Sequence, residues 1–65
     1  MIPEREYWTK FLNKKVTLQK INYFYTGIII EVLANKLVLD DRKEGEIILS
    51  FDGLSLIRSE DTKWT

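Results

Sequence analysis

The chain has 65 residues, of which 45% are hydrophobic and 31% charged, a balance typical of one small globular domain rather than a disordered segment. Ten Lys and Arg residues balance ten Asp and Glu residues, which disfavours a strongly basic, non-specific nucleic-acid binder. The sequence contains neither Cys nor His, which excludes disulfides and thiolate metal sites and removes the commonest general base.

The first predicted element is an amphipathic helix over residues 3–13. Pro3 suits the first turn of a helix, where its missing N–H costs nothing. Trp8, Phe11 and Leu12 are spaced i, i+3, i+4 and therefore share one face. Because so short a helix is marginal in water, we expect its aromatic face to dock on the rest of the domain.

After residue 15 the period of the apolar pattern changes from about 3.6 to about 2, which is typical of β-strands. The long stretch Tyr23–Val32 is rich in aromatic and β-branched residues, and Gly27 within it predicts a bulge or a sharp bend. A tight turn is expected at 33–36 and a charged hairpin loop at 41–45. The predicted strands cover residues 16–19, 23–32, 36–40, 46–51 and 54–58.

These elements predict a single domain over residues 1–65 that is mainly β. An N-terminal α-helix precedes a five-stranded, strongly bent antiparallel barrel over about residues 15–58. Closure into a barrel would remove the exposed edges that a flat sheet of this size leaves open. The helix is expected to cover one open end, and residues 59–65 form a tail that is polar except for Trp64.

Three stretches resemble the first signature block of Sm-like (LSm) domains: Lys14–Leu18, Tyr25–Val32 and Lys36–Asp41. The likeness extends from about Tyr7 to Ile57 and includes the order of elements, a helix before a bent barrel of the SH3-like type. Other small SH3-like barrels, such as the C-terminal domains of biotin protein ligases and of ribosome maturation factors, share a similar run. The resemblance implies RNA binding and assembly into a ring of subunits.

In Sm-like proteins an Asp and an Asn between the second and third strands line a uridine pocket, and an Arg-Gly pair follows near the fourth strand. The Asp position falls here on Leu33 or Ala34, and the Asn position falls on Lys36 or, with a shifted gap, on Asn35. The Arg-Gly pair is replaced by 50–51, which is Ser-Phe. The resemblance therefore implies a module that lacks the usual uridine pocket.

An aromatic run beside a lysine predicts a site for single-stranded RNA, because aromatic faces stack on bases and cations attract phosphates. Burial of these aromatics in the barrel or against the helix is the alternative. The candidate nucleic-acid-binding residues are Lys20, Asn22, Tyr23, Phe24, Asn35 and Lys36.

The neutral net charge conceals a polarity along the chain. Residues 1–20 hold five basic against two acidic residues, and residues 21–65 hold five against eight. A basic face at Lys10, Lys14 and Lys15 would attract a phosphate backbone, although such charges also occur on ordinary solvated surfaces. The two poles would equally attract each other between subunits.

Three consecutive isoleucines place apolar side chains on both faces of one strand, which a strand exposed on one face does not do. Ile28 and Ile30 are therefore the candidate contacts of a homo-oligomer, with a bend at Gly27 as the local alternative.

The sequence gives little support for enzyme activity or for metal binding. The acidic group at 40–46 matches no calcium loop, and no His activates Ser50, Ser55 or Ser59 as a nucleophile. We expect no enzyme activity, no metal, no cofactor and no small-molecule substrate.

No apolar run approaches the length of a membrane span, and the N-terminus does not resemble a signal peptide. We therefore expect a cytoplasmic protein without membrane association. The leading interpretation is a non-catalytic, self-assembling Sm-like module that binds RNA or other nucleic acid. The alternative is a module for protein–protein interaction or assembly that binds no nucleic acid.

Overall fold

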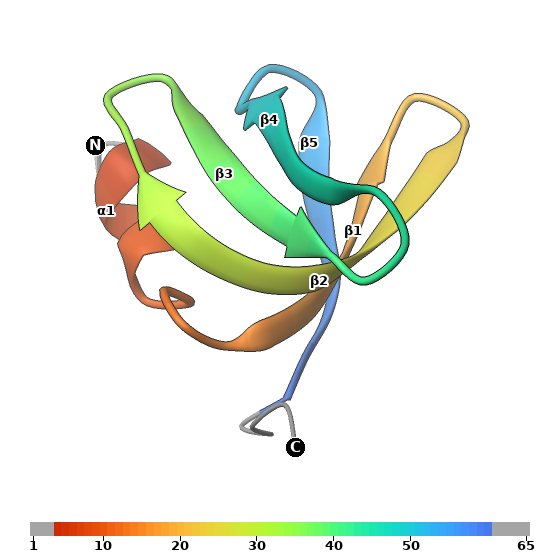
Figure 1. Ribbon diagram of the computed structural model, residues 1–65. Coiled ribbons are helices and arrows are strands. Elements are labelled where there is room, and N and C mark those ends of the chain that lie inside the picture. The colour runs from red at the N-terminus through yellow and green to blue at the C-terminus, as the bar shows by residue number, and fades with distance from the viewer. Residues whose placement is uncertain (1–3, 61–65) are drawn as a thin grey trace.

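The computed structural model describes residues 4–60 and confirms a mainly β chain with a short N-terminal helix (Figure 1). Five antiparallel strands form one sheet, and the helix lies beside it near the N-terminal end of the chain. The elements are α1 (Glu4–Thr9), β1 (Lys15–Lys20), β2 (Tyr23–Val32), β3 (Lys36–Asp41), β4 (Gly45–Ser50) and β5 (Leu54–Glu60).

The sheet has the strand order β4-β3-β2-β1-β5 and is strongly bent, but it is not a closed barrel. Each inner strand pairs with two neighbours, whereas β4 pairs only with β3 and β5 only with β1. The predicted barrel closure is therefore not confirmed. At one end a side chain spans the opening instead: the Lys20 ammonium donates to the Ser50 carbonyl (3.1 Å) and to the Asp52 carbonyl (2.5 Å).

The helix is shorter than the predicted 3–13. Phe11 N–H donates to the Trp8 carbonyl, three residues earlier, so the chain forms a tighter turn as soon as the helix ends at Thr9. Asn13 then adopts a left-handed backbone (φ 67°), and its N–H donates to the Ile29 carbonyl at 2.6 Å. Hydrogen bonding to β2 thus competes with continuation of the helix, and the chain turns into β1.

The core lies on the concave face of the bent sheet, where alternate residues of each strand point inward. Trp8 of α1 is only 3% exposed and stacks on Phe51, with ring centroids 6.2 Å apart. This contact docks the aromatic face of the helix on the sheet, as the sequence predicts. The core cluster comprises Trp8, Val16, Leu18, Ile29, Leu37, Leu39, Leu49 and Phe51.

The sheet has two bulges, and neither is at Gly27. The pairing register shifts between Ile29 and Glu31 in β2, which leaves Ile30 as the extra residue, and Ile57 is the extra residue in β5. Gly27 has a different role, because a Cβ at this position would overlap the Asp40 carbonyl oxygen of β3. The predicted bulge at Gly27 is therefore wrong, and the glycine instead permits a close approach of two strands.

The C-terminal strand is longer than the predicted 54–58. Ser59 and Glu60, placed in the polar tail by the sequence pattern, pair with β1 opposite Val16 and Lys15. Trp64 lies outside the described residues, as does Pro3. Within the described residues no helix is long and apolar enough to cross a membrane.

Candidate nucleic-acid interface

The register of β1 and β2 sorts the predicted aromatic residues onto two faces of the sheet. Lys20 pairs with Tyr23 and Leu18 with Tyr25, so these side chains share the concave face with the core. Gln19 pairs with Phe24, whose side chain therefore lies on the opposite, convex face. Tyr23 and Phe24 are similarly exposed, at 66% and 64%, yet they cannot belong to one stacking site.

Phe24 lies in a cavity of about 360 Å³ between β2 and the loop that joins β3 to β4. The register explains this neighbourhood, because Gly27 pairs with Asp41 and the following loop residues continue alongside the first half of β2. The cavity combines one exposed aromatic ring, one hydroxyl, three cations and one carboxylate. Its lining consists of Phe24, Thr26, Lys15, Arg42, Lys43 and Asp41.

The β3–β4 loop is shaped by the single carboxylate of this cavity. Asp41 Oδ1 accepts hydrogen bonds from the backbone N–H of Lys43 (2.7 Å) and of Glu44 (3.0 Å). This side-chain turn, followed by Gly45 with a φ of 82°, reverses the chain within a few residues. The lining carries three cationic side chains against this one carboxylate, so its formal charge is positive.

Polar side chains continue the convex face beyond Phe24. The hydroxyl oxygens of Thr17 and Thr26 lie 3.4 Å apart across β1 and β2, and both groups are exposed. Gln19 lies directly opposite Phe24, and its amide donates to the Ile21 carbonyl at 3.5 Å. The aromatic ring is thus bordered by neutral hydrogen-bonding groups on the sheet and by cations from the loop, with no charged residue paired directly opposite it.

The remaining predicted nucleic-acid residues lie in or beside the β1–β2 and β2–β3 loops, which project with the β4–β5 loop from the same end of the sheet (Figure 1). Lys20 is already held there, because its ammonium also donates to Ser50 Oγ at 2.7 Å in addition to two carbonyls. Lys36 pairs with Ser50 across β3 and β4, and the Asn35 carbonyl accepts the Phe51 N–H. The structure thus brings Lys20, Asn35 and Lys36 together around Ser50, but Lys20 serves the fold.

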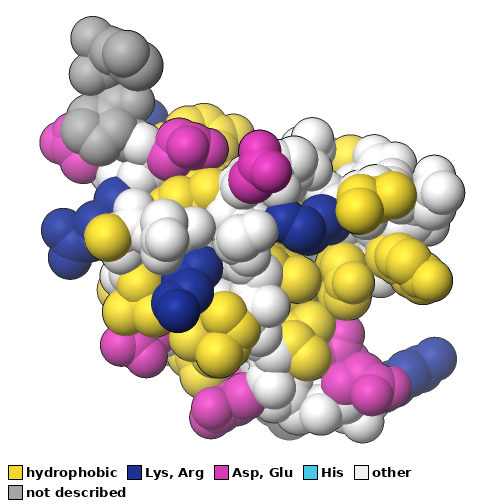
Figure 2. Space-filling view, turned by 90° about the horizontal axis from the view of Figure 1, so that it is seen from above, with side chains coloured by type: hydrophobic (Ala, Val, Ile, Leu, Met, Phe, Trp, Pro, Cys, Tyr) yellow, Lys and Arg dark blue, Asp and Glu magenta, His cyan; other side chains and the backbone are white. Residues whose placement is uncertain are grey.

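This loop end does not form a basic surface. Figure 2 views it from above and shows Lys and Arg side chains interspersed with Asp and Glu side chains. A cavity of about 330 Å³ beside Asn35 is lined by two carboxylate residues, Glu4 and Asp52, and by no Lys or Arg. Asn22 lies in the exposed turn of the β1–β2 hairpin, away from this cavity.

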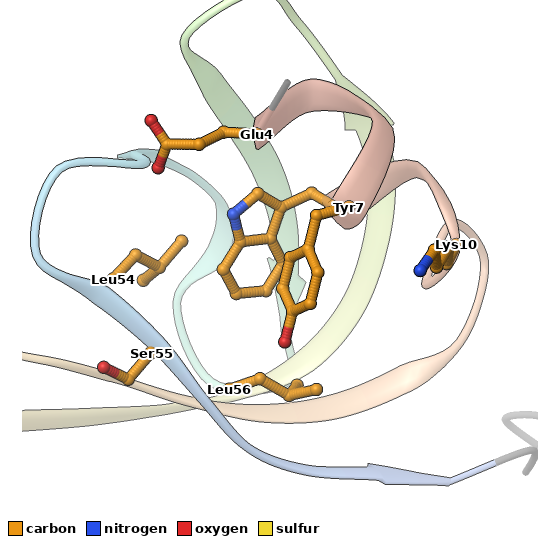
Figure 3. A pocket seen from close by; sticks show the side chains of 7 residues that line it. Glu4, Tyr7, Lys10, Leu54, Ser55 and Leu56 are labelled. Atoms are coloured by element: carbon orange, nitrogen blue, oxygen red, sulfur yellow. The ribbon is translucent and has the colours of Figure 1, made fainter. Parts of the chain in front are cut away.

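The predicted basic face is divided between two sites. Lys15 lines the cavity at Phe24, whereas Lys10 lies 5.8 Å from the centre of the Tyr7 ring. Lys10 and Tyr7 line a separate cavity of about 490 Å³ between α1 and β5, whose other walls include Trp8 and Leu56 (Figure 3). Lys14 belongs to neither lining, although its backbone bonds to Phe11 and Ile29.

Sequence reasoning missed Arg42, Lys43 and Thr26. The signal that leads to them is the pairing of β2 with β3, which places the charged hairpin loop at 41–45 beside Phe24. Among residues 4–60, His, Cys, Asp and Glu form no group of three or more arranged to hold a metal ion.

Comparison of the chain with known proteins yields no matching family model, no similar curated protein and no similar solved structure. The mainly antiparallel β fold therefore stands on the strand pairing itself. These comparisons therefore do not identify the chain as an Sm-like protein.

Proposed function

We propose that the protein is a non-catalytic, Sm-like binding module that associates with single-stranded RNA or other nucleic acid and self-assembles. The observation that supports this proposal is the exposed Phe24 ring in a cavity that it shares with Lys15, Arg42 and Lys43. Proteins bind single strands without a strict sequence preference by stacking bases on aromatic rings beside cations that follow the phosphates.

In this arrangement one base stacks on the Phe24 ring, which stands on the convex face of β2. The hydroxyls of Thr17 and Thr26 and the amide of Gln19 lie close enough along the sheet to hydrogen-bond the edges of a stacked base. The cations of the β3–β4 loop contact the adjoining phosphates. No group in this set is suited to nucleophilic catalysis, since none of the side chains has a histidine to activate it.

The usual uridine pocket of Sm-like proteins plays no part in this proposal. In the loop that would hold this pocket, the Asp position falls on Leu33 or Ala34, whose side chains are apolar. The proposed site lies instead on the sheet face, so it recognises a stacked base and a phosphate rather than a particular nucleobase.

The test compares two neighbouring aromatic residues of almost equal exposure. We expect Phe24→Ala to weaken the affinity for a fluorescent oligo-uridine or oligo-adenosine at low salt by about tenfold, because stacking contributes about 1–3 kcal/mol per base. Tyr23→Ala, on the opposite face, is the matched control and should change the affinity by less than about twofold. Equal losses in both variants, or no RNA binding by the wild-type protein, would contradict the proposal.

A protein-assembly module without RNA binding is the second candidate, because apolar side chains remain exposed on the sheet. Ile48 is 64% exposed and Ile57 is 53% exposed, one on each edge strand. Purified protein with an absorbance ratio free of nucleic acid, no affinity for the oligonucleotides and a mass above the monomer would favour this candidate.

A further inference from the structure

The two edges of the sheet differ in their readiness to pair with another strand. Strand β5 contains the bulge at Ile57, and on its face Arg58 and Glu60 form an ion pair at 2.9 Å. Bulges and charged side chains are the features by which proteins protect sheet edges from pairing. Strand β4 pairs with β3 in unbroken register over all six residues and has no charged residue from Ile47 to Ser50. From Ile47 to Leu49 its edge therefore lacks both forms of protection.

The hydrogen-bond pattern shows which groups of β4 face outward. Phe51 N–H donates to the Asn35 carbonyl, so this pair belongs to the hydrogen-bonded class of the β3–β4 ladder. Since the two classes alternate along an antiparallel ladder, Ile47 and Leu49 direct their backbone groups toward β3. Glu46, Ile48 and Ser50 direct theirs toward the open edge.

An apolar stripe reaches the same edge on the convex face. Ile48 lies opposite Val38, which is only 8% exposed although it does not belong to the core cluster. On the β2 side, Val38 pairs with Glu31, and the bulged residue Ile30 directly precedes Glu31 in β2. The stripe thus crosses β2 and β3 and ends at the most exposed of its members, Ile48.

We infer that β4 pairs with β4 of a second copy of this chain, in antiparallel orientation about a two-fold axis at Ile48. This register places the outward backbone groups of Ile48 opposite those of its counterpart and sets Ile47 against Leu49. Glu46 falls opposite Ser50, so no two like charges face each other across the junction. The apolar stripe of one copy continues into that of the second.

The self-complementarity of this register favours a second copy over a foreign strand. Every apolar residue of the edge meets an apolar residue, and the one acidic residue meets a hydroxyl. Lys20 donates to the Ser50 carbonyl, whose second lone pair remains for the Glu46 N–H of the second copy. A head-to-tail ring would instead require the bulged β5 edge, so this dimer replaces the ring that the Sm-like resemblance implies.

The dimer develops the self-association in the proposed function and is independent of RNA binding. Sedimentation equilibrium from micromolar to millimolar concentration should give a species of twice the 7.7 kDa chain mass and nothing larger. Ile48→Lys places two ammonium groups opposite each other and should weaken dimerisation by about tenfold or more. Ile57→Lys, with the same added charge on the other edge strand, is the control and should leave the dimer unchanged.

A strictly monomeric wild-type protein overturns the inference, as does a dimer that survives Ile48→Lys. Species larger than a dimer that dissociate in both lysine variants also overturn it, in favour of β4–β5 pairing. Hydrogen exchange gives a second readout that needs no variant: the amides of Glu46 and Ile48 should be protected only at high concentration. Oligonucleotide affinity measured on folded Ile48→Lys should equal that of the wild type, which separates failure of the dimer from failure of the RNA proposal.

Discussion

Single residues decide how closely the strands of this sheet approach one another. Gly27 is the clearest case, because its φ is not in the left-handed region and the lack of a side chain is what matters. The Asp40 carbonyl of β3 occupies the place that a Cβ would take. The glycine in the middle of β2 is therefore a steric requirement of the pairing between β2 and β3.

Gly27→Ala should lower the free energy of unfolding by about 3 kcal/mol, the upper range for overpacking, because backbone rather than a flexible side chain must move. Urea denaturation followed by circular dichroism measures the loss. Gly53→Ala is the contrasting variant: its Cβ would meet no atom within 4 Å, but its φ of 73° costs about 1 kcal/mol with a side chain. Equal losses of stability in the two variants would show that the overlap with the Asp40 carbonyl costs no more than the φ of Gly53, and would contradict the steric role of Gly27.

Elements are joined by contacts that the sequence pattern does not reveal. The pattern predicts α1 and all five strands, because the apolar periods and the turn residues are local properties. It misses the early end of α1, since the Asn13 N–H bonds to Ile29 far along the chain. It also misses the bulge at Ile30, because a run of three isoleucines has the same apolar pattern in a straight strand and in a bulged one.

The candidate site shows the same limit. Phe24 and Lys15 could be selected from the sequence as an aromatic residue and a cation. Arg42 and Lys43 could not, because their place beside Phe24 depends on the register between β2 and β3. Conversely, Lys20 looked like a ligand-binding cation, and only the structure shows that β1 uses it to hold the end of β4.

Lys20 therefore makes a prediction at the level of elements. Lys20→Met retains the aliphatic stem but loses the three hydrogen bonds to Ser50 and Asp52, and should destabilise the protein by about 1–2 kcal/mol. The expected loss of stability is small because Lys20 is half-buried, so water replaces part of the lost hydrogen bonding. Denaturation measures it, and hydrogen exchange should accelerate in the β4–β5 loop. Lys10→Met is the control. If Lys20→Met weakens RNA affinity much more than Lys10→Met does, Lys20 belongs to the RNA-binding site.

For the whole molecule, the equal numbers of acidic and basic residues have a measurable consequence for RNA binding. Because the net charge is zero, the proposed site relies on the local group of Lys15, Arg42 and Lys43 to attract phosphates. Release of counterions from a single strand contributes about −0.7 to the salt slope for each neutralised phosphate.

We therefore expect the logarithm of the RNA association constant to fall with the logarithm of salt concentration with a slope of about −2, as three phosphate contacts require. Fluorescence anisotropy over a series of salt concentrations measures this slope. Lys43→Gln should reduce its magnitude by about 0.7, whereas Lys36→Gln, at the other end of β3, should leave it unchanged. A slope of about −4 or steeper would require more cations than the cavity holds, and would assign RNA binding to a wider basic surface that includes Lys10 and Lys14.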